Sequence, residues 1–194
     1  MNKYSDNQMM ADIERIIISE EELQEMVARV GAQISRDYAG KNLLMVSVLK
    51  GSVIFMADLM RALTIPARID FMAVSSYGSG TKSSGVVKIA KDLDINLEGY
   101  DLLIVEDILD SGKTLFYLRQ MLLSRHPKSV KICTLFDKPD RREAPIAADY
   151  VGGLVPNEFI VGYGLDYDEK YRNLPFVGVL KRDCLLYTSP SPRD

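Results

Sequence analysis

Residues 102–115 read L-L-I-V-E-D-I-L-D-S-G-K-T-L, and this stretch decides the fold of the chain. Its apolar start, residues 102–105, is typical of a buried parallel strand. Two adjacent carboxylates, Glu106 and Asp107, follow at the predicted end of that strand, and a third acid follows within one turn. Residues 111–114, Ser-Gly-Lys-Thr, then begin an amphipathic helix. This order of strand, acids, hydroxyl-rich loop and helix predicts a site for a sugar phosphate.

Each polar group of this stretch suits one part of a phosphorylated ribose. Backbone N–H groups of the loop, with the hydroxyls of Ser111 and Thr114, can wrap a terminal phosphate at the helix N-terminus. Glu106 and Asp107 can accept hydrogen bonds from vicinal ribose hydroxyls, and they can hold Mg²⁺ directly or through water. Asp110 can act as a general acid or base.

Two other interpretations of the stretch explain it less well. A nucleotide-binding P-loop would share the Gly-Lys-Thr sequence, but it needs a glycine five positions before Gly112, where Asp107 stands. A helix capped by Asp110 or Ser111 would need only one acid. It leaves the other acids unexplained, because neighbouring carboxylates repel one another unless a cation or a polyol shares them.

The composition bounds the class of protein. The chain has 194 residues, which fits one domain, and its hydrophobic fraction of 47% and charged fraction of 26% are typical of soluble globular proteins. A net charge of -3 provides no field that favours nucleic acid. We find no apolar run of the ~18 residues that a membrane span needs and no secretory signal at the start. Cys133 lies in an apolar strand and is expected to be a reduced core residue, so we expect a cytoplasmic protein.

Strands and helices alternate along the rest of the chain. A capping box at Ser19 and Glu22 begins a helix that Gly40 ends. Predicted strands and helices then follow in this order: strand 43–49, helix 52–63, strands 68–76, 86–92 and 102–105, helix 112–125, strand 130–136, and short strands near Tyr150, 159–161 and 176–180. This pattern predicts an α/β fold with a doubly wound, mainly parallel sheet flanked by helices.

The C-terminal end departs from this pattern. Residues 186–194, L-Y-T-S-P-S-P-R-D, continue no periodicity, and we interpret them as a translated cloning or sequencing remnant. We therefore expect a single domain over residues 1–181 and a non-native or disordered tail over residues 182–194.

V-E-D-I-L-D-S-G-K-T at residues 105–114 resembles the phosphoribosyl-pyrophosphate (PRPP) signature of the type I phosphoribosyltransferases. More narrowly, residues 13–181 are similar to the hypoxanthine (hypoxanthine-guanine) phosphoribosyltransferases in four segments that follow the family's order. The resemblance implies the type I fold, with a small hood and a flexible lid loop. It also implies transfer of the 5-phosphoribosyl group from PRPP to N9 of hypoxanthine or guanine. That reaction forms IMP or GMP and pyrophosphate in purine salvage.

The resemblance assigns the phosphate side of the site. Lys50 and Gly51 match the family's pyrophosphate loop, in which the bond between Leu49 and Lys50 can be cis, and Arg172 matches an arginine that contacts pyrophosphate. Read alone, the Lys-Gly pair is a turn and the arginine is a surface residue. The implied PRPP-binding residues also include Glu106, Asp107, Asp110, Ser111, Gly112, Lys113 and Thr114. Ser76 and Tyr77 match the start of the lid, which would exclude water during transfer.

The resemblance also assigns the purine side. Lys138 would donate a hydrogen bond to the 6-oxo group, and it favours hypoxanthine, guanine or xanthine because a lysine is only a donor. Phe159 would stack on the base, Ile160 would offer backbone groups to its edge, and Asp166 would bind a second Mg²⁺. Read alone, these residues are a solvated lysine, a core strand and a turn residue. The preference among the three 6-oxopurines stays open.

The resemblance implies Mg²⁺ as cofactor, held by Glu106, Asp107 and Asp166, and Asp110 as the catalytic residue that manages the proton at N7 of the purine. It implies a homodimer or homotetramer, with no nucleic-acid or membrane partner. His126 precedes a proline at a helix end, where it is expected to be a C-terminal charge rather than a catalyst. Two alternatives remain: a phosphoribosyltransferase for adenine, uracil or orotate, and a regulator that senses PRPP on the same fold and binds nucleic acid.

Overall fold

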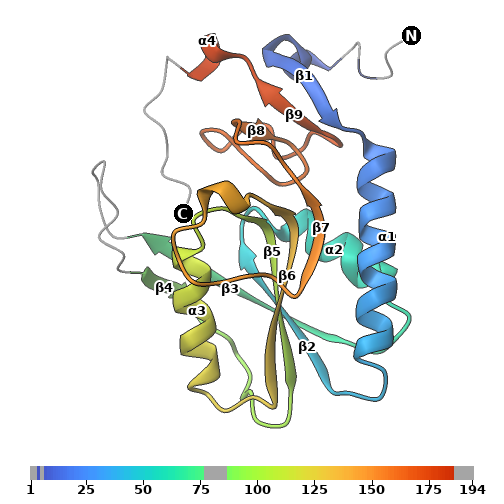
Figure 1. Ribbon diagram of the computed structural model, residues 1–194, viewed down its shortest axis with the longest axis vertical. Coiled ribbons are helices and arrows are strands. Elements are labelled where there is room, and N and C mark those ends of the chain that lie inside the picture. The colour runs from blue at the N-terminus through green and yellow to red at the C-terminus, as the bar shows by residue number, and fades with distance from the viewer. Residues whose placement is uncertain (1–3, 5–6, 77–86, 186–194) are drawn as a thin grey trace.

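A computed structural model describes the chain except for residues 1–3, 5–6, 77–86 and 186–194. Its centre is a six-stranded sheet in the order β4-β3-β2-β5-β6-β7 (Figure 1). These strands are β4 (Val87–Lys91), β3 (Arg68–Ser76), β2 (Leu43–Leu49), β5 (Asp101–Leu109), β6 (Ser129–Asp137) and β7 (Tyr150–Leu154). All neighbours are parallel except β4, which pairs antiparallel with β3 at one edge. The predicted mainly parallel α/β fold is confirmed.

Helices cover both faces of this sheet. α1 (Glu20–Asp37) and α2 (Val53–Ala62) pack on one face and α3 (Lys113–Leu123) packs on the other. Adjacent residues of a strand point to opposite faces, so Met45 of β2 joins the core under α1 and α2 whereas Leu44 joins the core under α3. Both side chains are fully buried.

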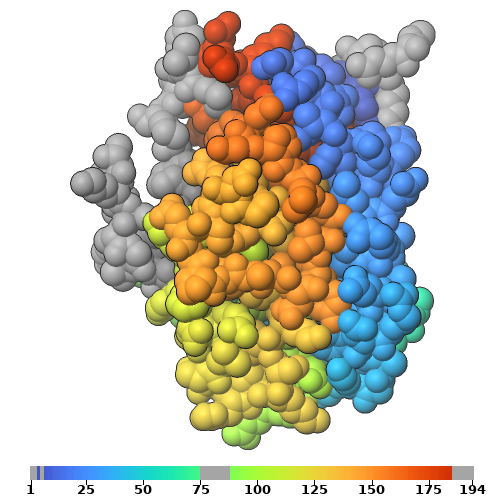
Figure 2. All heavy atoms as spheres, viewed as in Figure 1, coloured from blue at the N-terminus to red at the C-terminus, as the bar shows by residue number. Residues whose placement is uncertain are grey.

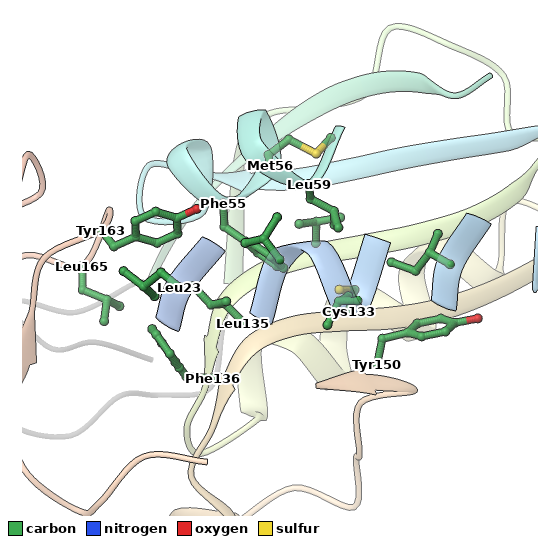
Figure 3. Packing of buried hydrophobic residues seen from close by; sticks show 14 of the residues in the cluster. Leu23, Phe55, Met56, Leu59, Cys133, Leu135, Phe136, Tyr150, Tyr163 and Leu165 are labelled. Atoms are coloured by element: carbon green, nitrogen blue, oxygen red, sulfur yellow. The ribbon is translucent and has the colours of Figure 1, made fainter. Parts of the chain in front are cut away.

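The larger core lies between β5, β6 and the two helices α1 and α2 (Figure 3). Leu23 of α1, Phe55 of α2 and Leu135 of β6 meet there, each with an exposed fraction of 1% or less. Cys133 lies in the same core as a free, buried thiol, as expected. Tyr163 and Leu165 extend this core toward the segment that follows β8, so the sheet and that segment share one packed interior.

A second, three-stranded sheet forms the small hood that the resemblance implies (Figure 1). Its order is β1-β9-β8, and its antiparallel strands are β1 (Ile13–Ile18), β9 (Val177–Leu180) and β8 (Ile160–Val161). The short helices are η1 (Gln8–Asp12), η2 (Pro139–Arg141) and α4 (Arg182–Leu185), the last within the segment assigned to the tail. β1 was not predicted, because its sequence I-E-R-I-I-I lacks the alternation of a half-buried strand.

Several predicted bounds are confirmed and one is wrong. β2 and β3 have the predicted bounds, and Ser19 and Glu22 form the predicted capping box at the start of α1. The strand predicted over residues 102–105 instead runs to Leu109, so Glu106 and Asp107 lie inside β5 rather than after it. The reason is that β6 continues alongside and supplies ladder partners as far as Asp137.

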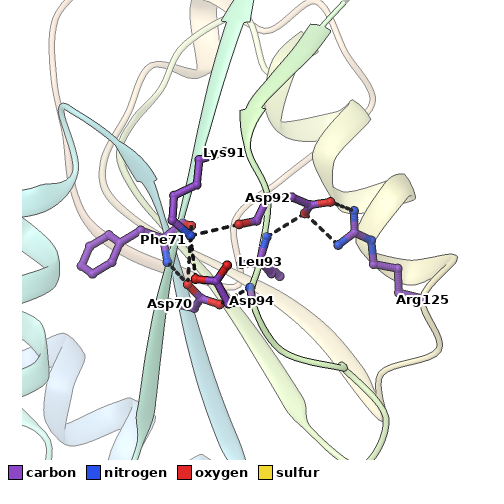
Figure 4. Close-up of polar contacts among 7 residues, drawn as sticks. All are labelled: Asp70, Phe71, Lys91, Asp92, Leu93, Asp94 and Arg125. Atoms are coloured by element: carbon purple, nitrogen blue, oxygen red, sulfur yellow. Dashed lines mark hydrogen bonds and ion pairs between the residues drawn. The ribbon is translucent and has the colours of Figure 1, made fainter.

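Charged pairs hold the connection between β4 and β5 against the rest of the sheet (Figure 4). Lys91 of β4 lies 3.6 Å from a carboxylate oxygen of Asp70 on β3, and it donates to the backbone oxygen of Phe71. Arg125, just after α3, donates two hydrogen bonds of 2.8 Å to the carboxylate of Asp92. These contacts tie the antiparallel edge to β3 and to the end of α3.

On the face shown in Figure 2, α1 runs along one side, and the segments that follow β6 lie against it. Within the part of the chain that the structure describes, no helix is both long and apolar enough to cross a membrane.

Candidate active site

The order of the parallel strands creates a switch point between β2 and β5. The chain leaves β2 toward β3 on one side, and it leaves β5 toward β6 on the other side. In open α/β sheets, ligands bind outside the carboxyl ends of the strands at such a point. The segments that leave β2 and β5 here are residues 50–52 and residues 110–112.

A cavity of about 560 Å³ lies at this switch point. Its walls come from the ends of β2, β3 and β5, the start of α3, the segment after β6, and the hood. The predicted site residues that line it are Lys50, Gly51, Glu106, Asp107, Asp110, Ser111, Gly112, Thr114, Lys138, Phe159, Ile160, Asp166 and Arg172. The volume is within the range of small-molecule sites.

The loop before α3 has a backbone that only glycine suits. Gly112 adopts φ +81°, and a Cβ there would lie 2.6 Å from a methyl carbon of Ile146. The backbone oxygen of Ser111 accepts hydrogen bonds from Glu143 and Ala144 at 2.9 and 3.1 Å, which holds the loop against the segment after β6. The N-terminus of α3 therefore lies in the cavity wall, and the positive end of the helix dipole is located there.

The loop after β2 approaches β5 equally closely. The peptide bond between Leu49 and Lys50 is cis. The hydroxyls of Ser47 and Ser52, both fully buried, lie 2.7 Å apart beneath the loop. A Cβ on Gly51 would lie 1.9 Å from Oδ2 of Asp107, so the absence of a side chain lets that carboxylate stand against the loop.

Glu106 and Asp107 are adjacent carboxylates in the cavity wall. Burial raises the pKa of Glu106 well above its ordinary value, and the negative charge of Asp107 adds to this rise. A hydroxyl donor or a cation between the carboxylates would offset both effects. The pair is therefore arranged for a polyol or a hard metal ion.

Asp110, which follows β5, also lines the cavity and has a cationic neighbour. Its Oδ1 lies 2.8 Å from Nε of Arg141, although this contact lacks hydrogen-bond geometry. Arg142 donates to the backbone oxygen of Asp110 at 3.1 Å and pairs with Asp137. Two consecutive arginines thus hold the residue predicted to act on the base.

The wall predicted to receive the base is built from β6 and the start of the hood. Lys138, with an exposed fraction of only 7%, donates from Nζ to the backbone oxygen of Glu158 at 2.9 Å. The ring of Phe159 is half-buried and meets Tyr167 edge to face at 5.2 Å. An aromatic face and a nearly buried ammonium are therefore presented together.

The hood contributes an anion and a cation. Arg172 donates to the backbone oxygen of Gly164 at 2.8 Å, and it forms ion pairs with Asp166 at 3.1 Å and with Glu169 at 3.5 Å. Nε of Arg172 is buried and has no acceptor among the described residues. A Cβ on Gly164 would lie 2.0 Å from the backbone oxygen of Gly51, so this part of the hood packs directly on the loop after β2.

Some predicted site residues lie elsewhere. The ammonium of Lys113 pairs with Glu143 at 2.5 Å and is not part of the cavity wall. Ser76 is the last residue of β3, and its side chain, Tyr77 and the rest of the predicted lid lie outside what the structure describes. His126 follows the C-terminal end of α3, away from the cavity, as expected.

The cavity also contains polar residues that the sequence analysis did not select, namely Arg141, Asn157 and Glu158. Arg141 lies three residues after Lys138, and proximity to that lysine was the only signal available. The local sequence does not distinguish Arg141 from Arg142, because the role of each depends on the acid that it contacts in the folded chain.

The carboxylates of the cavity suit Mg²⁺ only in part. Among the residues that the structure describes, no three His, Cys, Asp or Glu side chains are grouped closely enough to hold a metal. Mg²⁺ is usually bound through one or two carboxylates together with phosphate oxygens of the substrate. The adjacent pair Glu106 and Asp107, and the separate Asp166, fit that second mode.

A mainly parallel α/β sheet with a cavity at its switch point, where adjacent acids and the start of a helix lie beneath a hood, is the arrangement of a phosphoribosyltransferase. The model of the phosphoribosyl transferase domain family matches residues 19–168, and the chain belongs to that family.

Relatives in sequence and structure narrow this class. The chain is 58% identical over 172 residues to the hypoxanthine-guanine phosphoribosyltransferase of Streptococcus thermophilus, which covers 89% of this chain and 96% of the relative. The crystal structure of a hypoxanthine phosphoribosyltransferase from Staphylococcus aureus matches with a TM-score of 0.91 and 48% identity, over 95% of this chain and 100% of that one. A hypoxanthine-guanine phosphoribosyltransferase from Bacillus anthracis, with a HEPES molecule in its active site, matches with a TM-score of 0.84 and 48% identity. That match covers 88% of this chain and 100% of the other.

Proposed function

We propose that this chain transfers the 5-phosphoribosyl group from PRPP to N9 of a 6-oxopurine, hypoxanthine or guanine, in purine salvage. The bond from C1′ of the ribose to the pyrophosphate oxygen breaks and the bond from C1′ to N9 forms. The products are IMP or GMP and pyrophosphate. The observation that carries the proposal is the cavity at the β2–β5 switch point, which is lined by residues of 49–51, 106–112, 138 and 159–166.

The phosphate and ribose sites follow from the loop geometry. The 5′-phosphate would bind the N–H groups and hydroxyls of residues 111–114, where the helix dipole favours an anion. Glu106 and Asp107 would accept hydrogen bonds from the ribose hydroxyls. Their negative charge would also stabilise the oxocarbenium character that develops at C1′. Lys50, Gly51 and Arg172 would hold the pyrophosphate, and the buried, unpartnered Nε of Arg172 supports this role.

The base site would use Lys138, Phe159, Ile160 and Asp110. Lys138 would donate to the 6-oxo group, Phe159 would stack on the ring, and backbone groups of Ile160 would meet the base edge. Asp110 would take or supply the proton at N7. The ion pair between Asp110 and Arg141 orients the carboxylate.

Mg²⁺ would be held by Glu106 and Asp107 on one side and by Asp166 on the other, each with substrate oxygens. When bound, it neutralises charge on the departing pyrophosphate. Excess EDTA should abolish turnover and leave the melting temperature of the ligand-free chain unchanged, because no three-ligand cluster exists among the described residues. A large fall in melting temperature would contradict a substrate-dependent metal.

We also propose that the protein acts in the cytoplasm as a homodimer or homotetramer. The family resemblance supports both the location and the assembly. Light scattering of the purified chain tests the assembly, and a monomer would contradict it.

A panel of bases tests the substrate class. Nucleotide formation is followed with PRPP, Mg²⁺ and, in turn, hypoxanthine, guanine, xanthine, adenine, uracil and orotate. We expect product with hypoxanthine and guanine, because Lys138 presents donors and adenine carries an amino group at position 6. If only adenine gave a product, or if none of the six bases did, the proposal would be overturned.

A further inference from the structure

Two tight turns in the hood have the same backbone conformation, but only the first has glycine at its second central position. In the first, residues Gly162 and Leu165 exchange backbone hydrogen bonds around Tyr163 and Gly164, whose φ values are +51° and +99°. In the second, Tyr167 and Lys170 do the same around Asp168 and Glu169, with φ values of +52° and +62°. Positive φ at both central residues defines a type I′ turn, in which glycine favours the second central position.

Glu169 takes this glycine-favouring position in the second turn. A non-glycine residue in the left-handed region costs roughly 1–2 kcal/mol, and such strain is concentrated at functional sites. The turn directs the carboxylate toward two cations that line the cavity. Its Oε2 lies 3.0 Å from Nζ of Lys50 and 3.5 Å from a terminal guanidinium nitrogen of Arg172. The backbone N–H of Glu169 donates to Asp166 at 2.9 Å, which fixes the base of the side chain.

The two cations that Glu169 contacts are those assigned to pyrophosphate. They come from different segments, Lys50 from the loop after β2 and Arg172 from the hood, and a single carboxylate oxygen bridges them. These two ion pairs are enough to account for the position of the Glu169 carboxylate. The carboxylate therefore occupies the charge environment that a pyrophosphate oxygen would require.

We propose that Glu169 is an internal competitor for pyrophosphate, which pairs with Lys50 and Arg172 when the site is empty and is displaced when PRPP or pyrophosphate binds. This inference rests on the proposed function, since it takes both cations as pyrophosphate ligands. By recapturing the cations, Glu169 weakens the binding of the product and promotes its release. It thereby tunes affinity without contacting the reacting atoms.

The exposure of these groups makes the exchange feasible. The side chains of Glu169 and Lys50 are 63% and 67% exposed, so their pair is weak and easily displaced. Glu169 stands between the ammonium of Lys50 and the guanidinium of Arg172, and both contacts are made through the same carboxylate oxygen. Arg172 is 24% exposed, and Asp166 continues to hold it when Glu169 leaves.

Equilibrium binding of inorganic pyrophosphate to the full chain tests the inference, in Mg²⁺ buffer at fixed ionic strength. We expect Glu169→Gln and Glu169→Ala to bind pyrophosphate roughly threefold to tenfold more tightly than the parent chain. The KM for PRPP should fall in the same direction, and the KM for hypoxanthine should not change. Glu169→Ala repeats the test if the glutamine amide still bonds to Lys50.

Asp168→Asn is the matched control. It removes the same charge from the neighbouring residue of the same turn, and its partner is Lys170, at 3.6 Å, which does not line the cavity. Pyrophosphate affinity within twofold of the parent supports a specific role of Glu169. Equal tightening in Asp168→Asn would show only a general charge effect and overturn the proposal. Weaker or unchanged binding in the Glu169 variants would also overturn it. If the parent chain forms no nucleotide from PRPP, the proposed function fails instead, which separates the two claims.

Discussion

Gly51 is where the loop after β2 contacts Asp107, one of the two acids proposed to bind the ribose. Substituting Gly51 tests whether that contact matters for catalysis. A Cβ built on this residue would lie 1.9 Å from Oδ2 and 2.9 Å from Cγ of Asp107, both on the same carboxylate. Gly51 does not have positive φ, so Gly51→Ala adds a methyl group without a backbone conformation that alanine rejects. The substitution is therefore a steric probe of one side chain.

The size of the displacement follows from these distances. Ordinary van der Waals contact begins near 3.4 Å, so the carboxylate oxygen must move by about 1.5 Å. A misplacement of about 1 Å in a catalytic group can reduce turnover by about 10²-fold. We therefore expect kcat/KM for PRPP to fall by about 10²-fold, which corresponds to ~2.7 kcal/mol. Overpacking of this kind destabilises a fold by about 1–3 kcal/mol, and the lower value applies because Asp107 ends in a movable carboxylate.

The assay measures initial rates of nucleotide formation over a range of PRPP concentrations, with thermal unfolding of the same samples. Gly153→Ala is the matched control. Its Cβ would lie 3.1 Å from the terminal methyl of Met26, a flexible side chain remote from the cavity, and we expect full activity. A Gly51→Ala enzyme with the parent kcat/KM would refute the reasoning, since Asp107 would then tolerate the displacement.

Three other substitutions test separate parts of the account. Asp110→Asn should lower the chemical step by roughly 10²–10⁴-fold, measured in single-turnover experiments, with no change in melting temperature; a fully active variant would remove the proposed acid–base role. Lys138→Met keeps the buried stem but removes every donor, so the KM for hypoxanthine should rise by about tenfold or more while the KM for PRPP stays constant; an unchanged KM for hypoxanthine would contradict the base assignment. The hydrogen bonds of Arg125 lower the pKa of the Asp92 carboxyl, so this group stabilises the fold above its ordinary pKa, and the effect is lost as pH falls through the lowered pKa of the folded state. Asp92→Asn should therefore reduce the free energy of unfolding at pH 7 by at most about 1 kcal/mol, given that Asp92 is 48% exposed, and by nothing near pH 2; a deficit that persists in acid would contradict this.

Local signals account for the parts of the fold that the sequence predicted well. The apolar runs of β2 and β3 have the predicted bounds because both strands are bordered by turn residues. The capping box at Ser19 needs only four residues in a row to form. By contrast, β1 exists because Ile13 pairs with Leu180 at the other end of the chain, and no local pattern predicts that pairing.

The same distinction applies to the site. The proposed phosphate loop and the adjacent acids are contiguous in the sequence, so spacing alone was enough to predict a role for them. The purine wall needed the family resemblance, because Lys138 and Phe159 are ordinary residues until the fold brings them to one cavity. Contacts such as Arg141 with Asp110, and Glu169 with Lys50, join charges from distant segments. Many surface charges could form such pairs, so only the three-dimensional structure shows which of them do.

The central claim is that one cavity holds PRPP and the purine with a fixed assignment of its walls. A crystal structure of the chain with IMP, pyrophosphate and Mg²⁺ tests this most directly. We predict the 5′-phosphate on residues 111–114, the ribose hydroxyls on Glu106 and Asp107, the base between Phe159 and Lys138, and pyrophosphate on Lys50 and Arg172. A 5′-phosphate bound at Lys50 and Gly51 instead, or a base away from Lys138, would contradict the account.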